Sequence, residues 1–172
     1  MTRISDERSI VGIDPTPRGL AFVFFESGEL LDWGTRRVDG NELAVLERLL
    51  DAFRADVLVL ENPDAAGSER RPRMTVLLRR LAEHALSRGV TVVTVGRRDV
   101  RETYAKRGMT RKHSVAADIA ATFPEVEPLV PRPRKVYRSE EARAEIFDAI
   151  SLVVHAFPME PSNDQSHGPL AA

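Results

Sequence analysis

Four acidic residues stand at positions where the neighbouring sequence predicts burial. Asp14 follows the apolar run SIVGI, and Glu61 follows the run VLVL. Glu145 and Asp148 lie three residues apart in the segment AEIFDAISLVV. A buried carboxylate is costly unless a cation or a hydrogen-bonding partner compensates its charge. Acids that converge therefore predict a cation, and ligands that are all oxygen favour Mg²⁺ or Mn²⁺.

Metal ions held by such acids hydrolyse phosphodiester bonds. Two ions about 3.5–4 Å apart activate a water molecule and stabilise the leaving oxygen. Glu145 and Asp148 suit this role, since residues three apart share one helix face with Cβ atoms roughly 5–6 Å apart. Taken singly, each of three acids also has a simpler explanation. Asp14 could start a turn, Glu61 could end a strand in solvent, and Glu145 could be an ordinary exposed helix residue. Asp148 does not have such an explanation, because apolar residues surround it.

Basic residues gather in the middle of a chain whose formal net charge is only -1. Residues 69–112 hold 13 Lys or Arg against 4 Asp or Glu, and residues 130–138 hold four basic residues and no acid. This segregation favours a surface for a polyanion such as nucleic acid, although solvated helix surfaces produce similar patterns. The predicted nucleic-acid contacts are Arg70, Arg71, Arg73, Arg111, Lys112, Arg132, Arg134, Lys135 and Tyr137.

The elements that must position these side chains follow from apolar periodicity and from turn residues. Strands are predicted at 9–14, 20–26, 30–38, 56–61 and 90–95, and helices at 41–54, 74–88, 99–106, 111–122 and 139–157. Residues 124–133, with four prolines, are predicted to be extended. This order predicts an α/β fold with a mixed five-stranded sheet, its first three strands antiparallel, and helices on both faces.

Length and composition restrict the class of protein. The 172 residues suit one domain, expected at 1–158 and followed by a disordered tail at 159–172. The chain has no cysteine, which excludes disulfides, thiolate zinc sites and cysteine nucleophiles. No apolar run is long enough to cross a bilayer, and the first residues do not suit a signal peptide, so a cytoplasmic location is expected.

Four segments resemble RuvC-type Holliday junction resolvases, which belong to the ribonuclease H-like superfamily. The first hairpin of that family, with its Asp between Gly-Ile and Pro, is similar to IVGIDPTPRGLAFVFFE. The strand that ends on a catalytic Glu is similar to VLVLENP, and the last helix is similar to AEIFDAISLVVHAF. A basic turn before a helix is similar to KRGMTRKHSVAADIAATFP. The resemblance covers residues 9–157.

The resemblance implies a ribonuclease H-like fold and a metal-dependent endonuclease that cleaves branched or structured DNA and leaves a 5′-phosphate. Asp14, Glu61, Glu145 and Asp148 would be the catalytic acids and would hold two Mg²⁺ or Mn²⁺ ions. Lys112 would lie near the scissile phosphate. Two symmetric cuts need two active sites, so a homodimer is expected.

Three features depart from the family pattern. Thr16 and Pro17 stand where the family usually has Gly, and Glu145 stands where it usually has Asp. The segment 62–73 carries arginines but lacks the aromatic residue with which the family commonly probes a junction. Two alternatives therefore stay open. One is a non-catalytic ribonuclease H-like module that binds nucleic acid or a protein, and the other is a relative of actin-like ATPases, whose second phosphate loop is missing here.

Overall fold

The computed structural model describes residues 3–4, 6–131 and 143–160. The elements, in chain order, are β1 (Arg3–Ile4), β2 (Ile10–Thr16), β3 (Gly19–Glu26), β4 (Glu29–Arg37), α1 (Glu42–Ala52), β5 (Val57–Glu61), α2 (Pro72–Ser87), β6 (Thr91–Val95), α3 (Arg97–Lys106), α4 (Lys112–Thr122), the 3-10 helix η1 (Pro124–Leu129), α5 (Ala144–Ala156) and β7 (Met159–Glu160).

Five of these strands form a mixed sheet in the order β4-β3-β2-β5-β6. The hairpin strands β2, β3 and β4 pair antiparallel, whereas β5 and β6 continue the sheet in parallel from β2. This is the predicted fold class, and it is confirmed. In the part of the chain that the structure describes, no helix is long and apolar enough to span a membrane.

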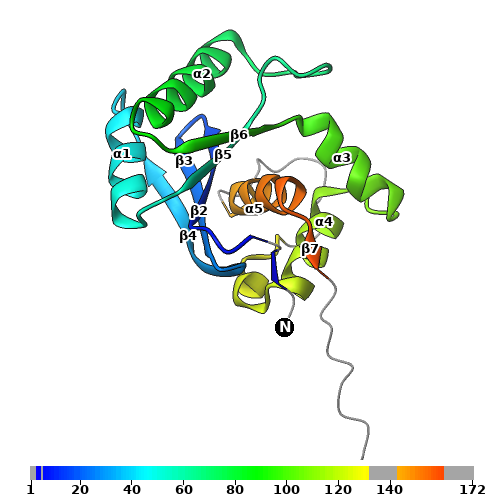
Figure 1. Cartoon of the computed structure of the whole chain (residues 1–172). Coiled ribbons are helices and arrows are strands. Elements are labelled where there is room, and N and C mark those ends of the chain that lie inside the picture. The colour runs from blue at the N-terminus through cyan, green and yellow to red at the C-terminus, as the bar shows by residue number, and fades with distance from the viewer. Residues whose placement is uncertain (1–2, 5, 132–142, 161–172) are drawn as a thin grey trace, which may run out of the picture.

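Helices cover both faces of the sheet (Figure 1). Side chains alternate between the faces, as strand geometry requires. Val11, Phe22 and Leu58 belong to the hydrophobic cluster that packs against α1 and α2. Ile10, together with Val59 and others, belongs to the cluster that packs against α3, α4 and α5. The long apolar strands are thus buried on both faces, which explains their nearly continuous hydrophobic sequence.

Helix α5 lies directly on β2, and Gly12 makes this close approach possible. A methyl group at Gly12 would overlap Cγ2 of Val153, lie 2.9 Å from Cγ2 of Val23 and lie 3.3 Å from the carbonyl oxygen of Ala149. Real Cβ atoms do not approach other atoms so closely, so a residue other than glycine would push the helix away. The glycine therefore sets the distance between strand β2 and helix α5.

Some predicted boundaries and environments differ from the structure. Residues 124–129, predicted to be extended, form the 3-10 helix η1, because prolines suit the first turn of a helix. The apolar pattern of α2 predicts that Val76, Leu77, Leu81 and Leu86 face inward. In the structure the buried residues of α2 are Leu78, Leu81 and Ala85, while Val76 and Leu86 are exposed.

The two ends of the described chain also differ from the prediction. Residues 159–160, predicted to start the tail, pair as β7 with β1. Helix α5 begins at Ala144, and the predicted helix start at 139 lies outside the described residues.

Candidate catalytic site

Strand pairing places Asp14 and Glu61 side by side at one edge of the sheet. Ile13 of β2 pairs with Leu60 of β5 in parallel register, so the next residues of the two strands are the two acids. Neighbouring strands lie about 4.8 Å apart. Because alternate residues of a strand face the same side, Asp14 shares a face with Ile10, and Glu61 shares one with Val59; Ile10 and Val59 face α5. Asp14 and Glu61 are therefore directed to one face, and both are buried.

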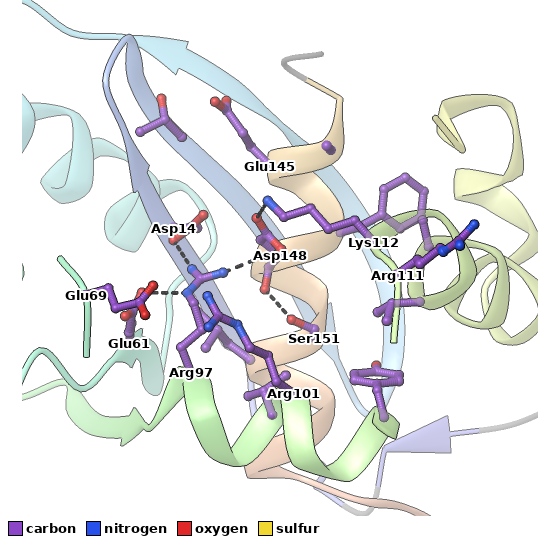
Figure 2. Close-up of a pocket in the computed structure, with 18 of the residues that line it drawn as sticks. Asp14, Glu61, Glu69, Arg97, Arg101, Arg111, Lys112, Glu145, Asp148 and Ser151 are labelled. Atoms are coloured by element: carbon purple, nitrogen blue, oxygen red, sulfur yellow. Dashed lines mark hydrogen bonds and ion pairs between the residues drawn. The ribbon is translucent and has the colours of Figure 1, made fainter. Parts of the chain in front are cut away.

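The third acid comes from helix α5. Asp148 lies on the face of α5 that looks toward the ends of β2 and β5, and its side chain is 23% exposed. Its backbone carbonyl accepts a hydrogen bond from the hydroxyl of Ser151 at 2.7 Å. Figure 2 shows Asp14, Glu61 and Asp148 converging on one point from three separate elements.

That point holds the guanidinium of Arg97, which contacts all three carboxylates through three different nitrogens (Figure 2). Nη2 donates to Oδ1 of Asp14 at 2.7 Å, and Nε donates to Oε2 of Glu61 at 2.8 Å. Nη1 lies 3.5 Å from Oδ1 of Asp148. Arg97 is the first residue of α3, and its side chain is 18% exposed.

A second guanidinium, from Arg70, binds the two strand acids. Nη2 donates to Oδ1 of Asp14 at 2.5 Å, and Nε donates to Oε2 of Glu61 at 2.7 Å. Nη1 donates to the carbonyl oxygen of Pro15 at 3.3 Å. Arg70 lies in the segment that joins β5 to α2, so its position depends on a loop rather than on the sheet.

Burial and charge act in opposite directions on these groups. Burial raises the pKa of Asp14 from 3.8 to about 6, against the opposing charges of Arg97 and Arg70. Burial also acts to raise the pKa of Glu61, but the hydrogen bond from Arg70 and the charge of Arg97 outweigh it, so that pKa lies below its ordinary value. The charges of Arg97 and Arg70 thus limit the rise in the pKa of Asp14, and for Glu61 the two guanidiniums outweigh the effect of burial.

The donor chemistry suits a hard divalent cation, because Asp14, Glu61 and Asp148 offer only oxygen atoms. Across the described ranges, however, no group of three or more His, Cys, Asp or Glu side chains is arranged to hold a metal ion. The two arginines contact the same oxygen of each strand acid, Oδ1 of Asp14 and Oε2 of Glu61. The residues thus fit a divalent ion, provided that at least one guanidinium gives way to it.

The other two predicted catalytic residues lie further out. Lys112, the first residue of α4, places Nζ 3.4 Å from Oδ2 of Asp148, with its side chain 57% exposed. Figure 2 shows Glu145 nearer the start of α5 than Asp148, with its carboxylate directed away from Arg97. Glu145 lines the same cavity as the other acids but lies apart from their arginine contacts.

The site opens into a cavity of about 500 Å³ with a partly basic rim. Arg101, Arg111 and Lys112 line it from α3 and from the start of α4. A second hollow of about 330 Å³ shares Thr16 and Glu145 with the first and extends along the hairpin. Its basic lining residues are Arg18, Arg36 and Arg37.

The predicted nucleic-acid contacts divide into three groups. Arg71, Arg73, Arg111 and Lys112 are exposed. Arg70 instead lies on the buried acids, with its side chain 21% exposed. The remaining four predicted residues lie outside the described part of the chain: Arg132, Arg134, Lys135 and Tyr137.

Reasoning from sequence missed Arg97, although a signal was present. Arg97 stands two residues after β6, which lies parallel to β5. Parallel strands end at the same edge of a sheet, so a residue just after β6 lies near Glu61. The predicted helix start at 99 obscured this position, since α3 begins two residues earlier.

The fold is shared with solved structures, whereas no protein-family model and no curated protein sequence matches the chain. Thermus thermophilus RuvC superposes with a TM-score of 0.59 at 20% identity, covering 87% of this chain and 93% of that chain. The structure of T. thermophilus RuvC in complex with a Holliday junction superposes with a TM-score of 0.59 at 19% identity, and the same shares of the two chains are covered. The chain has a RuvC-like resolvase fold.

A third structure with this RuvC-like fold is the yeast mitochondrial Holliday junction resolvase Ydc2. The match covers 87% of this chain and 77% of the Ydc2 chain. Its TM-score is 0.55 and its identity 13%. The RuvC-like fold agrees with the resemblance of the four sequence segments and confirms the ribonuclease H-like fold class.

Proposed function

We propose that this chain is a divalent-metal-dependent endonuclease that hydrolyses phosphodiester bonds in branched or structured DNA. The observation that carries the proposal is the convergence of Asp14, Glu61 and Asp148 from three elements of a RuvC-like fold. T. thermophilus RuvC, which shares this fold, forms a complex with a Holliday junction substrate, which supports branched DNA as the first substrate to test.

Asp14, Glu61 and Asp148 would hold Mg²⁺ or Mn²⁺, with Glu145 positioned to contact water or substrate at the edge of the cavity. The ion would supply a polarised phosphate oxygen and a more acidic water. Hydrolysis forms a bond between water oxygen and phosphorus and breaks the bond between phosphorus and the 3′ oxygen, which leaves a 5′-phosphate. Lys112, at the mouth of the site beside Asp148, would bind a non-bridging phosphate oxygen.

Basic side chains on both sides of the cavity would hold the DNA backbone. Arg111 and Lys112 lie at the start of α4, where the helix N-terminus also favours a phosphate. On the other side, the hollow along the hairpin offers Arg18, Arg36 and Arg37. The two hollows share Thr16 and Glu145 as lining residues, so one bound strand would contact both groups of basic side chains.

A homodimer would supply the two sites that paired cuts in a four-way junction require. Sedimentation equilibrium of the full chain checks this part of the proposal. A monomer at every concentration, alone and with junction DNA, would contradict the homodimer and the paired cuts that depend on it.

The test of the activity is cleavage of labelled four-way junction, flap and linear duplex DNA in Mg²⁺ or Mn²⁺. Wild type and Asp148→Asn are compared, because Asn keeps the size of the side chain and removes its charge. We expect nicking of the branched substrates by wild type and a loss of at least about a hundredfold in Asp148→Asn, the scale on which loss of one charge-stabilising group slows such a reaction. Equal cleavage by both proteins would exclude this site as the source of the activity.

The arginine contacts favour one competing function, a module that binds nucleic acid without cleaving it. In that case Arg70 and Arg97 would neutralise Asp14 and Glu61 permanently. Binding of junction DNA that weakens with salt, combined with no cleavage in either metal, would support the module over the nuclease.

A further inference from the structure

The position of Arg97 is determined by the sheet. Asn62, which follows β5, donates its backbone N–H to the carbonyl oxygen of Val95 at 2.8 Å and so extends the pairing of β5 with β6. Gly96 then packs so tightly that a Cβ atom there would lie 3.3 Å from Cβ of Ala65. Arg97 follows immediately as the first residue of α3. Its backbone is therefore held at the edge where the acids converge.

Its guanidinium stands where a cation bridging the three acids would stand. Nε, Nη1 and Nη2 each face a different carboxylate, at 2.8, 3.5 and 2.7 Å. Within the described ranges, Arg70 contacts the two strand acids and the backbone carbonyl of Pro15. Of the two arginines, Arg97 thus combines the rigid backbone with the contact to Asp148.

Charge balance limits how many divalent ions this site can add. Among the described residues, the formal charges of the carboxylates of Asp14, Glu61 and Asp148 are balanced by the three basic side chains that contact them, Arg70, Arg97 and Lys112. One divalent ion in place of Arg70 leaves a single positive charge, which a bound phosphate diester neutralises. A second divalent ion, with Arg97 in place, leaves an excess of three positive charges in the protein without DNA, and of two with the phosphate bound, beside buried groups, which is unfavourable.

We propose that Arg97 takes the place of one metal ion, so that the site binds a single divalent ion and uses the guanidinium as its second cation. This inference rests on the proposed function, because it concerns the cations of the same site. Arg97 is then a catalytic residue that contacts the reacting phosphate, and the fork of its guanidinium suits two phosphate oxygens.

The experiment counts Mn²⁺ ions bound to the full-length chain, without DNA, from the electron paramagnetic resonance signal of free Mn²⁺. Wild type, Arg97→Gln, Arg97→Lys and Arg98→Gln are compared. Arg98 is a matched control, because it neighbours Arg97 on α3 but pairs with Glu102 at 2.8 Å on the surface. Circular dichroism establishes that each variant is folded.

We expect one Mn²⁺ per chain in wild type, Arg97→Lys and Arg98→Gln, and two per chain in Arg97→Gln. Two ions in wild type, or one ion in folded Arg97→Gln, would overturn the inference. If Arg97→Gln does not fold, the counts in wild type and Arg97→Lys decide: two ions in wild type contradict a resident guanidinium cation, and two ions in Arg97→Lys contradict a positive charge that excludes the second ion.

The same experiment separates this inference from the proposed function. Two ions in a wild-type protein that cleaves junctions would overturn only the role of Arg97. No bound Mn²⁺ in any of the four proteins would overturn both the role of Arg97 and the metal-dependent nuclease.

Discussion

The substitution Gly12→Ala tests whether the contact between β2 and α5 positions the acids. The added methyl would overlap Cγ2 of Val153 and lie 2.9 Å from Cγ2 of Val23, whereas carbon atoms in contact lie about 3.5–4.0 Å apart. Because the interior is closely packed, such overpacking costs about 1–3 kcal/mol. We expect the free energy of unfolding to fall by that amount, and Tm to fall by roughly 3–10 °C.

The same substitution should reduce activity more than it reduces stability. The overlap pushes α5 outward, which separates Asp148 on α5 from Asp14 on β2. A displacement of about 1 Å in a catalytic group costs roughly a hundredfold in rate. We expect Gly12→Ala to remain folded at about 25 °C in urea titrations followed by circular dichroism, yet to nick junction DNA at least about tenfold more slowly than wild type.

The control is a double-mutant cycle with Val153→Ala, which removes the closest overlapping atom. The cost of the double substitution should be smaller than the sum of the single costs by at least about 0.5 kcal/mol, since the two residues share one space. Additive costs, or a Gly12→Ala protein with wild-type stability and activity, would refute the reasoning, because α5 would then not rest on Gly12.

Three further predictions concern charge. The pKa of Asp14 is about 6 in the folded chain against an ordinary 3.8, so its contribution to stability is full at low pH and is lost as pH rises through about 6. The side chain in Asp14→Asn does not titrate. The free energy of unfolding of this variant, measured in urea and compared with wild type at the same pH, should therefore increase by about 1–1.5 kcal/mol between about pH 5 and pH 7.5. A decrease in this difference would contradict a raised pKa for Asp14. Arg70→Ala removes a cation that competes with metal, so Mn²⁺ affinity should increase about tenfold in calorimetry, whereas weaker binding would mean that Arg70 supports the metal site. If Arg37 contacts a phosphate, Arg37→Ala should lower the slope of log affinity for junction DNA against log salt by about 1, and an unchanged slope would place the DNA elsewhere.

Much of the fold follows from local patterns in the sequence. Apolar runs such as those before Asp14 and Glu61 identified the strands, and the turn at residues 27–28 identified the hairpin of β3 and β4. These patterns are local, because strand and helix periodicity reflect burial of one face or both. The sequence did not show that Val76 and Leu86 are exposed, because a helix with apolar residues on several sides does not reveal which of them meets the sheet.

Three of the predicted acids converge, and the reason is partly visible in the sequence. Asp14 and Glu61 each end a strand, and parallel neighbours end at the same edge of a sheet. The position of Asp148 depends on where α5 packs, and that depends on Gly12 and its neighbours across the core. Glu145 shows the limit of spacing arguments, since it shares a helix with Asp148 but lies apart from the arginine-bound acids.

The sequence by itself determined the five strands of the main sheet and the five α-helices, the acids that end β2 and β5, and the basic character of the middle of the chain. Only the tertiary structure decided what compensates those acids. Arg97 and Arg70 lie 83 and 56 residues from Asp14 along the chain, so no local pattern connects them to it. Their contacts arise because β6 and the segment before α2 end at the same edge of the sheet, and a guanidinium can neutralise buried carboxylates there.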